Sequence, residues 1–230
     1  MNSTPVAHRS ANPHLLMAVM AAIMLVAVAA QPSYATPPDR QAMHDFATGG
    51  AITGTFSMLH RGDEAIASTI RTTATPGHAI TLWYVIFNAP GNCSDGVCGA
   101  DDLFLDPAAG GAGGFNGAQI DAARISVVYG GDGGVVNPGG RLALDGGLAE
   151  GEVPSGAGQV VIGTEGALVP LSPVTGLEDA QAAEVHIVLQ DHGLAHDDPD
   201  VLASQLSSFN GGCNPTCGDI QFSVHMPVHL

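Results

Sequence analysis

The chain has 230 residues and a formal net charge of −16, and all six of its cationic side chains are arginine. Nucleic-acid binding and polybasic attachment to anionic lipid both need clustered cations, so the absence of lysine and of arginine clusters argues against them. The absence of lysine also excludes a Walker-type phosphate loop and lysine-based Schiff-base chemistry. Glycine (31) and proline (15) are abundant but stay below the share typical of a disordered polymer.

The N-terminal segment has the pattern of a secretory signal peptide. A polar stretch with one cation and no acid, Met1–His14, precedes an unbroken apolar run of 16 residues, Leu15–Ala30. The tripeptide Ser33–Ala35 then provides the small residues of a cleavage site. A transmembrane helix needs about 20 apolar residues and Gln31-Pro32 ends this run earlier, so we expect cleavage, with an uncleaved anchor as the alternative.

Export would place the mature chain in a secreted, periplasmic or extracellular compartment, with no transmembrane span after cleavage. We expect residues 1–35 to be the signal peptide, residues 36–50 a polar lead-in and residues 51–230 one domain, because the remaining length suits a single domain. Apolar or alternating segments of that domain are separated by Gly, Pro, Asn and Asp, which is typical of a β protein.

The hydrophobic pattern predicts eight strands. Ala79–Asn88 is the strongest, since both of its faces are apolar, and we expect it to be a central strand covered on both sides. In Ile220–His225 the pattern predicts a core face of Ile220, Phe222 and Val224, with Gln221, Ser223 and His225 opposite. The predicted strands are Ala51–Leu59, Ala65–Thr73, Ala79–Asn88, Arg124–Tyr129, Arg141–Leu144, Gln159–Ile162, Ala183–Gln190 and Ile220–His225.

One segment is clearly helical in pattern. Asp198 can cap a helix that begins at Pro199, and apolar residues follow at helical spacing as far as Phe209. The glycine-rich stretches Ala108–Gly117 and Gly130–Gly140 are expected to be long surface loops. Together these elements predict a mostly β fold: a single antiparallel β-sandwich or jelly-roll-like domain with one short helix and long loops.

The four cysteines form two close pairs in turn-like segments. In a cytosolic protein they would suggest a zinc site, but outside the cytosol disulfides form and persist. We expect the local pairing, Cys93 with Cys98 and Cys213 with Cys217. A bridge between the two loops is the alternative, and it would constrain the unfolded chain more strongly.

Histidines provide one hypothesis of function. Strand alternation places His186 and His225 opposite the predicted core faces of their strands, where they would converge if the strands are neighbours. His192 and His196 follow in a segment rich in aspartate, Asp191–Asp198. Imidazole suits copper or zinc, so these four histidines are candidate metal ligands. The simpler interpretation, which we favour, is a half-buried His186 that is hydrogen-bonded to a neighbour such as Glu184, with His192 and His196 as loop residues at a helix start.

Acidic residues provide a second and weaker hypothesis of function. Asp101, Asp102 and Asp106, and separately Asp197, Asp198 and Asp200, could supply oxygen ligands for calcium, but neither group has EF-hand spacing. A solvated acidic surface explains them better. Serine-nucleophile (G-x-S-x-G) and zinc-protease (H-E-x-x-H) motifs are absent from the sequence.

Several stretches resemble a group of exported bacterial proteins of unassigned function. They are Leu82–Pro90 (LWYVIFNAP), Ala183–Gly193 (AEVHIVLQDHG), Phe209–Cys213 (FNGGC) and Gln221–His225 (QFSVH). The resemblance covers most of residues 51–225 and implies no catalytic residues. The strand with Trp83 and the Ala183–His186 segment are also similar to chordin-type (CHRD) β domains. The doubled histidine of that family is missing here, so this likeness implies β architecture only.

These observations favour an exported, non-enzymatic β domain that binds an unknown extracellular ligand or protein, or that acts at the cell surface. The alternative is an exported copper- or zinc-binding protein, with a metalloenzyme as one form of it, that uses His186, His192, His196 and His225.

Overall fold

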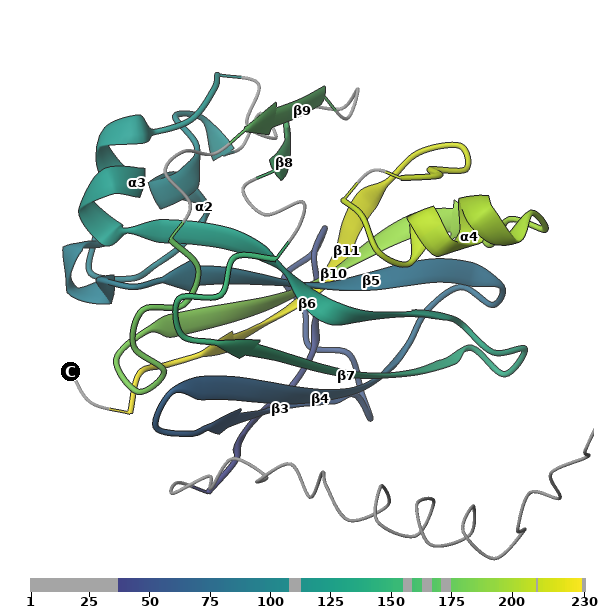
Figure 1. Ribbon diagram of the computed structural model, residues 1–230, viewed down its shortest axis with the longest axis horizontal. Coiled ribbons are helices and arrows are strands. Elements are labelled where there is room, and N and C mark those ends of the chain that lie inside the picture. Colours follow the sequence, from purple (N-terminus) through teal and green to yellow (C-terminus); the bar gives the residue numbers. More distant parts are fainter. Residues whose placement is uncertain are drawn as a thin grey trace, which may run out of the picture. The chain divides into compact units, whose positions relative to one another are not determined.

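The computed structural model describes most of the chain after the predicted signal peptide. The residues described are 37–107, 113–154, 159–162, 167–170, 175–209 and 211–228. The predicted signal peptide lies outside them, as does half of the predicted loop 108–117, residues 108–112. The fold is mostly β, as the sequence predicts, and two antiparallel sheets pack face to face as a sandwich-like domain (Figure 1).

The smaller sheet has four antiparallel strands in the order β1-β3-β4-β7. Their bounds are Asp39–Gln41, Phe56–Arg61, Ala65–Thr73 and Arg141–Ala149. β4 has the predicted bounds, whereas β3 begins five residues later than predicted, because the chain first makes a turn at Thr53-Gly54.

The larger sheet has five strands in the order β2-β11-β10-β5-β6. Their bounds are His44–Asp45, Gly218–His225, Glu184–Leu194, His78–Phe87 and Ile125–Val135. A separate hairpin is formed by β8, Gln159–Ile162, and β9, Ala167–Pro170. The segment 36–50, expected to be a lead-in, contributes β1 to one sheet and β2 to the other, and its Met43 is fully buried.

The main core lies between the two sheets. β5 contributes Ile80, Leu82, Tyr84 and Ile86, which alternate with side chains on its other face. β10 and β5 are paired over nearly their whole length, and β6 pairs with the other edge of β5. The predicted central strand is thus confirmed, and its second face carries Trp83 and Phe87 in a smaller cluster.

Three helices lie on the far side of the five-stranded sheet from the four-stranded sheet (Figure 1). They are α2, Ala100–Leu103, α3, Gly117–Ala123, and α4, Pro199–Gln205, and a 3-10 turn, η1, spans Pro90–Asn92. The sequence predicts only α4; α2 has four residues, and α3 follows directly on a glycine-rich stretch. Asp198 caps α4 as predicted, since its side chain accepts the backbone N–H of Asp200 and Val201.

The glycine-rich stretch Gly130–Gly140 is not a loop throughout, which corrects the prediction. β6 continues through it to Val135. A side chain at Gly130 would collide with Leu82, and one at Gly133 would collide with the backbone of Leu206. The glycines therefore allow close approach of neighbouring backbone within a strand, a use that composition alone does not distinguish from a loop.

The face of β11 that was predicted to be its core face is also corrected. Val185 of β10, a core residue, pairs with His225, and Val188, on the opposite face, pairs with Phe222. Gln221, Ser223 and His225 therefore point into the sandwich, where β3 and β4 offer polar partners. Phe222 lies on the face that carries the helices, so both faces of this strand contact other elements.

Candidate functional site

The structure does not bring the four predicted histidine ligands together. His186 pairs in register with Val224, and His225 pairs with Val185, so the two imidazoles lie on opposite faces of the sheet. His196 caps backbone near α4, where its Nδ1 accepts the N–H of Asp198 at 3.0 Å. Within the described residues, the one group of side chains with metal-binding spacing includes only His192 of the four.

His186 has the partner that the simpler interpretation names. Its Nε2 lies 2.7 Å from Oε1 of Glu184, and its ring contacts that of Phe87 at 4.8 Å between centroids. Both residues of this pair are largely buried. The pair lies on the face of β10 that carries the helices, and there it borders a cavity.

That cavity has a volume of about 460 Å³. Its floor is the outer face of the five-stranded sheet. Its walls come from the first disulfide loop, from α2 and the residues that follow it, from Phe46 after β2 and from Phe209 after α4. The lining side chains are mostly apolar, and seven are aromatic or imidazole rings: Phe46, Trp83, Phe87, Phe104, Phe209, Phe222 and His186. A cavity of this size and character is typical of small-molecule sites.

Charged groups at the pocket are few and acidic. Asp219 is the only carboxylate in the lining, and no arginine lines it within the described chain. Desolvation by the surrounding protein atoms raises the pKa of Asp219 to about 6, although the residue is exposed. Concave surroundings explain both facts, since many atoms surround the carboxyl while the opening keeps it accessible.

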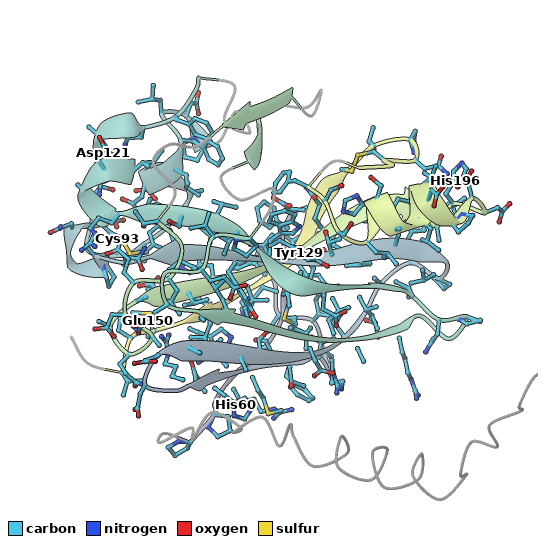
Figure 2. All side chains as sticks on the ribbon, in the orientation of Figure 1. His60, Cys93, Asp121, Tyr129, Glu150 and His196 are labelled. Atoms are coloured by element: carbon cyan, nitrogen blue, oxygen red, sulfur yellow. A yellow bond between two sulfur atoms is a disulfide. The ribbon has the colours of Figure 1, made fainter. Side chains whose placement is uncertain are left out.

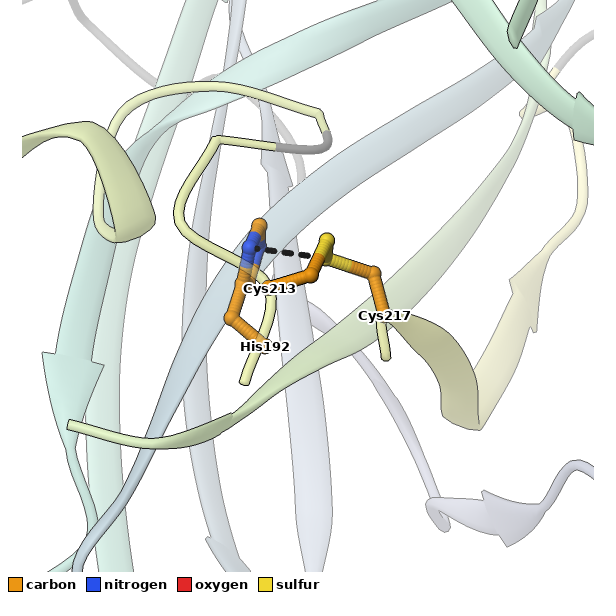
Figure 3. A group of neighbouring side chains, drawn as sticks. All are labelled: His192, Cys213 and Cys217. Atoms are coloured by element: carbon orange, nitrogen blue, oxygen red, sulfur yellow. Dashed lines mark hydrogen bonds between the residues drawn. A yellow bond between two sulfur atoms is a disulfide. The ribbon is translucent and has the colours of Figure 1, made fainter. Parts of the chain in front are cut away.

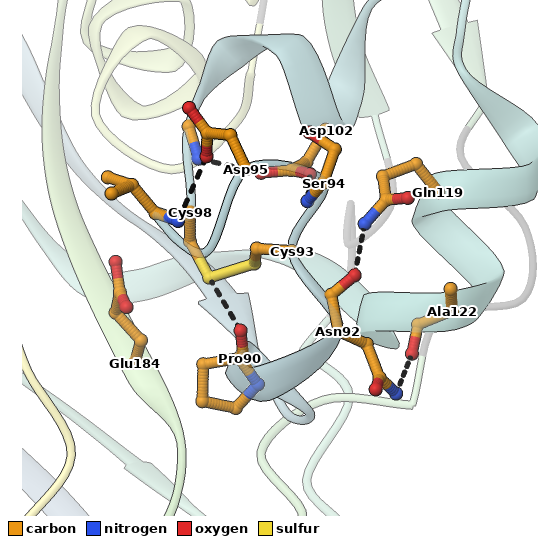
Figure 4. The surroundings of a disulfide bond; sticks show 12 residues. Pro90, Asn92, Cys93, Ser94, Asp95, Cys98, Asp102, Gln119, Ala122 and Glu184 are labelled. Carbon is orange, nitrogen blue, oxygen red and sulfur yellow. Dashed lines mark hydrogen bonds between the residues drawn. A yellow bond between two sulfur atoms is a disulfide. The ribbon is translucent and has the colours of Figure 1, made fainter.

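The first disulfide fixes one wall of the pocket. Cys93 and Cys98 are bonded, as predicted, and Cys98 lines the cavity. The fully buried carboxylate of Asp102 accepts backbone N–H groups from Ser94 (2.8 Å) and Gly99 (2.9 Å), which ties α2 to this loop (Figure 4). Asp102, one of the weak calcium candidates, is thus used to hold the loop.

The second disulfide, Cys213–Cys217, is also paired as predicted and lies beside His192 (Figure 3). Nδ1 of His192 is 3.2 Å from Sγ of Cys217 and 3.1 Å from the carbonyl oxygen of Gly211. The ring is fully buried, and burial lowers its pKa, an effect opposed by the hydrogen bond to Gly211 and by the charge of Asp191. The ligand atoms of the three side chains lie within 4.8 Å of one another.

A third arrangement lies inside the sandwich and has the order of a serine–histidine–aspartate relay. Nε2 of His225 is 2.9 Å from Oγ of Ser57, and its Nδ1 is 2.9 Å from Oδ2 of Asp39. Ser57 and His225 are both fully buried, and Ser57 also bonds Ser223 at 2.7 Å. Burial lowers the pKa of His225, opposed by its bond to Asp39. A substrate cannot reach this hydroxyl, so the relay joins the two sheets.

Figure 2 shows how far apart the sequence-predicted features lie. Cys93 is at one end of the larger sheet and His196 at the other, beside α4. Sequence reasoning missed the pocket, because its lining comes from seven parts of the chain that are far apart in sequence. The available signal was the second apolar face of Ala79–Asn88, which carries Trp83 and Phe87.

Comparison of the chain with protein-family models, curated proteins and solved structures finds no match. Among the helices that the structure describes, none has the length and apolar character that a membrane crossing requires.

Proposed function

We propose that this protein is an exported binding protein, and that it takes a small, largely apolar and uncharged or cationic ligand in the pocket on the outer face of the five-stranded sheet. The observation that carries the proposal is the cavity of about 460 Å³ with aromatic walls. Burial of ligand surface against such walls provides the affinity, and a few polar groups provide orientation.

The shape of the pocket supports this role because rigid elements hold its lining. Trp83, Val85 and Phe87 project from the central strand β5, and His186 and Val188 project from its neighbour β10. The wall around Cys98 is fixed by the disulfide and by Asp102. A preformed site of this kind loses little conformational entropy when a ligand enters.

The charge of the site supports a ligand without an acidic group. Asp219 and the Glu184–His186 pair are the ionisable groups at the pocket, and the chain as a whole carries a formal charge of −16. An anionic ligand would be repelled and would find no arginine to pair with. A cationic or neutral head group could approach Asp219 and the surrounding rings.

Export is supported by the sequence of residues 1–35 and by the two disulfides, which persist outside the cytosol. We expect the protein recovered from the producing cell's exported fraction to begin at Thr36. Intact-mass spectrometry checks this, and a full-length chain in the cytosolic fraction would contradict it.

The binding proposal is tested with two fluorescent probes that share one aromatic body. N-phenyl-1-naphthylamine is neutral, and 8-anilinonaphthalene-1-sulfonate adds a sulfonate. We expect saturable one-to-one binding of the neutral probe and at least tenfold weaker binding of the anionic probe.

A pocket-filling variant provides the control for location. Val224 is half-buried and lines the pocket from β11, so Val224→Trp should abolish binding of the neutral probe. Thr73→Trp adds the same side chain at an exposed position of β4 and should leave binding unchanged. Equal binding by wild type and Val224→Trp would refute the proposed site.

A further inference from the structure

The loop closed by Cys213 and Cys217 and the end of β10 form a second site, separate from the pocket. Asn214 donates its backbone N–H to the carbonyl oxygen of His192 at 2.8 Å, and Gly193 forms a bridge with Asn214. Gly193 has a φ of +78°, and a side chain there would collide with the backbone of Asn214. Glycine thus permits the close approach that places His192 against the disulfide.

The buried ring of His192 is held from its far side. Its Nε2 is 2.9 Å from Oγ1 of Thr81, and the same oxygen accepts the indole N–H of Trp83 at 2.8 Å. A hydroxyl oxygen has two lone pairs, so it can also accept an Nε2–H from the imidazole. Metal-binding histidines are usually oriented in this way, with one nitrogen on the metal and the other donating to a fixed acceptor.

We propose that reduction of the Cys213–Cys217 disulfide creates a binding site for one Cu(I) ion, with both thiolates and Nδ1 of His192 as ligands. A dithiol reductant supplies two electrons and two protons, so that the S–S bond becomes two thiols and the reductant becomes a disulfide. Cu(I) then displaces the two thiol protons to solvent. The ring changes tautomer, so that its proton leaves Nδ1 and is carried by Nε2, which donates a hydrogen bond to Oγ1 of Thr81.

The donor set selects the metal. Two thiolates and one imidazole are soft ligands, which favour Cu(I) and zinc over calcium or magnesium. Structural zinc takes four ligands, whereas the group contains three within the described part of the chain. Three donors suit Cu(I). Both cysteines are partly exposed, so a reductant and the ion can reach them.

The other disulfide is a matched comparison within the same chain. Cys93 and Cys98 are also separated by a short loop, but Sγ of Cys98 is 3.6 Å from the carbonyl oxygen of Pro90, and no histidine joins this pair in a metal-binding group among the described residues. Its reduction should create no comparable site.

The experiment titrates purified protein with Cu(I) under anaerobic conditions, with bathocuproine disulfonate as the competing chelator. Oxidised wild type should bind no Cu(I) in this competition. Wild type reduced with a small dithiol, which is then removed by desalting, should bind one equivalent. Because both samples are the same chain, their comparison does not depend on how a variant folds.

Variants assign the ligands. Cys93→Ser/Cys98→Ser, reduced, should keep the Cu(I) equivalent, and Cys213→Ser/Cys217→Ser should lose it. His192→Ala should weaken binding at least tenfold, and X-ray absorption of the wild-type complex should show both sulfur and nitrogen neighbours of copper. Equal binding by oxidised and reduced protein, loss on removal of the Cys93–Cys98 pair, or preference for zinc over Cu(I) would overturn the proposal.

Discussion

The two faces of the five-stranded sheet contact very different surroundings. The inner face packs against the four-stranded sheet and is filled by aliphatic side chains and by polar groups that bond one another, such as Ser57, Ser223 and His225. The outer face carries aromatic rings and leaves a cavity of about 460 Å³ between the sheet and the helices. The same strands thus form a closed core on one side and an open pocket on the other.

This difference separates stability from binding in a single element. Consecutive residues of a strand point to opposite faces, so Ile187 and Val188 of β10 lie next to each other in sequence and contribute to different clusters. Changes on the inner face should act on folding, and changes on the outer face should act on the ligand. Four measurements can break or sharpen that distinction.

The largest effect is expected from truncation of Ile187 on the inner face, compared with truncation of its sequence neighbour Val188 on the outer face. Ile187→Ala removes a fully buried side chain from a closed core and should lower the free energy of unfolding by about 2–5 kcal/mol. Val188→Ala should cost about 1.5 kcal/mol, since it removes two methyl groups beside an open cavity. Urea denaturation measures both values, and equal losses would contradict the distinction between the faces.

The next largest effect on stability is expected when a polar group on each face is replaced in turn. Ser57→Ala removes two buried hydrogen bonds, one to Ser223 and one to His225, and should cost about 1–3 kcal/mol. Asp219→Asn should not destabilise the protein at pH 7.5. The pKa of Asp219 is raised to about 6 in the folded state, so the stability that this carboxyl contributes is present at low pH and is lost as the pH rises through 6. Denaturation at pH 7.5 tests both variants, and a large loss in Asp219→Asn would show that its carboxylate has a structural role.

The fold could be predicted from the sequence where one signal dominates. Alternation predicted β4, and apolar residues on both faces predicted the central position of β5. Spacing predicted both disulfides, and the Asp198-Pro199 pair predicted the start of α4. These features depend on neighbouring residues, so local pattern is sufficient for them.

Features that depend on partners could not be predicted in this way. The inward face of β11 is polar because Ser57 and Thr72, far away in sequence, bond Ser223 and Gln221. The glycines of β6 indicate a loop by composition, but they are required by the backbone of Leu206 and the side chain of Leu82. His192 was singled out for its neighbouring histidine, whereas its actual neighbours in space are two cysteines.

A smaller effect on the free energy of unfolding is expected when the pH is lowered. Burial lowers the pKa of His225 and of His192 in the folded state, so both rings stay neutral when the unfolded chain begins to take up protons near pH 6.5. Their contribution to stability is present above pH 6.5 and is lost as the pH falls towards the folded-state pKa values, by at most about 1.4 kcal/mol per pH unit for each ring.

This loss is best measured in the Asp219→Asn background, because ionisation of Asp219 acts in the opposite direction over the same range. The free energy of unfolding should fall between pH 7.5 and pH 5.5, and His225→Gln should reduce the slope. A slope that is unchanged by both His225→Gln and His192→Gln would show that the inner face does not set the acid response.

The smallest effect concerns the outer face alone, and the test is whether the affinity for the probe rises or falls as the pH is lowered. A neutral probe that fills the pocket removes water from around Asp219 and so favours the protonated carboxyl. Its affinity should rise about fivefold as the pH falls from 7.5 to 5.0, a coupling at the low end of those seen between linked binding events. His186, which is bonded to Glu184, also lines the pocket, but Asp219→Asn leaves this pair intact, so loss of the pH dependence in this variant assigns it to Asp219. An affinity that instead rises with pH in the wild type would mean that the probe is held by the ionised carboxylate, and the apolar rings would then be secondary to charge in choosing the ligand.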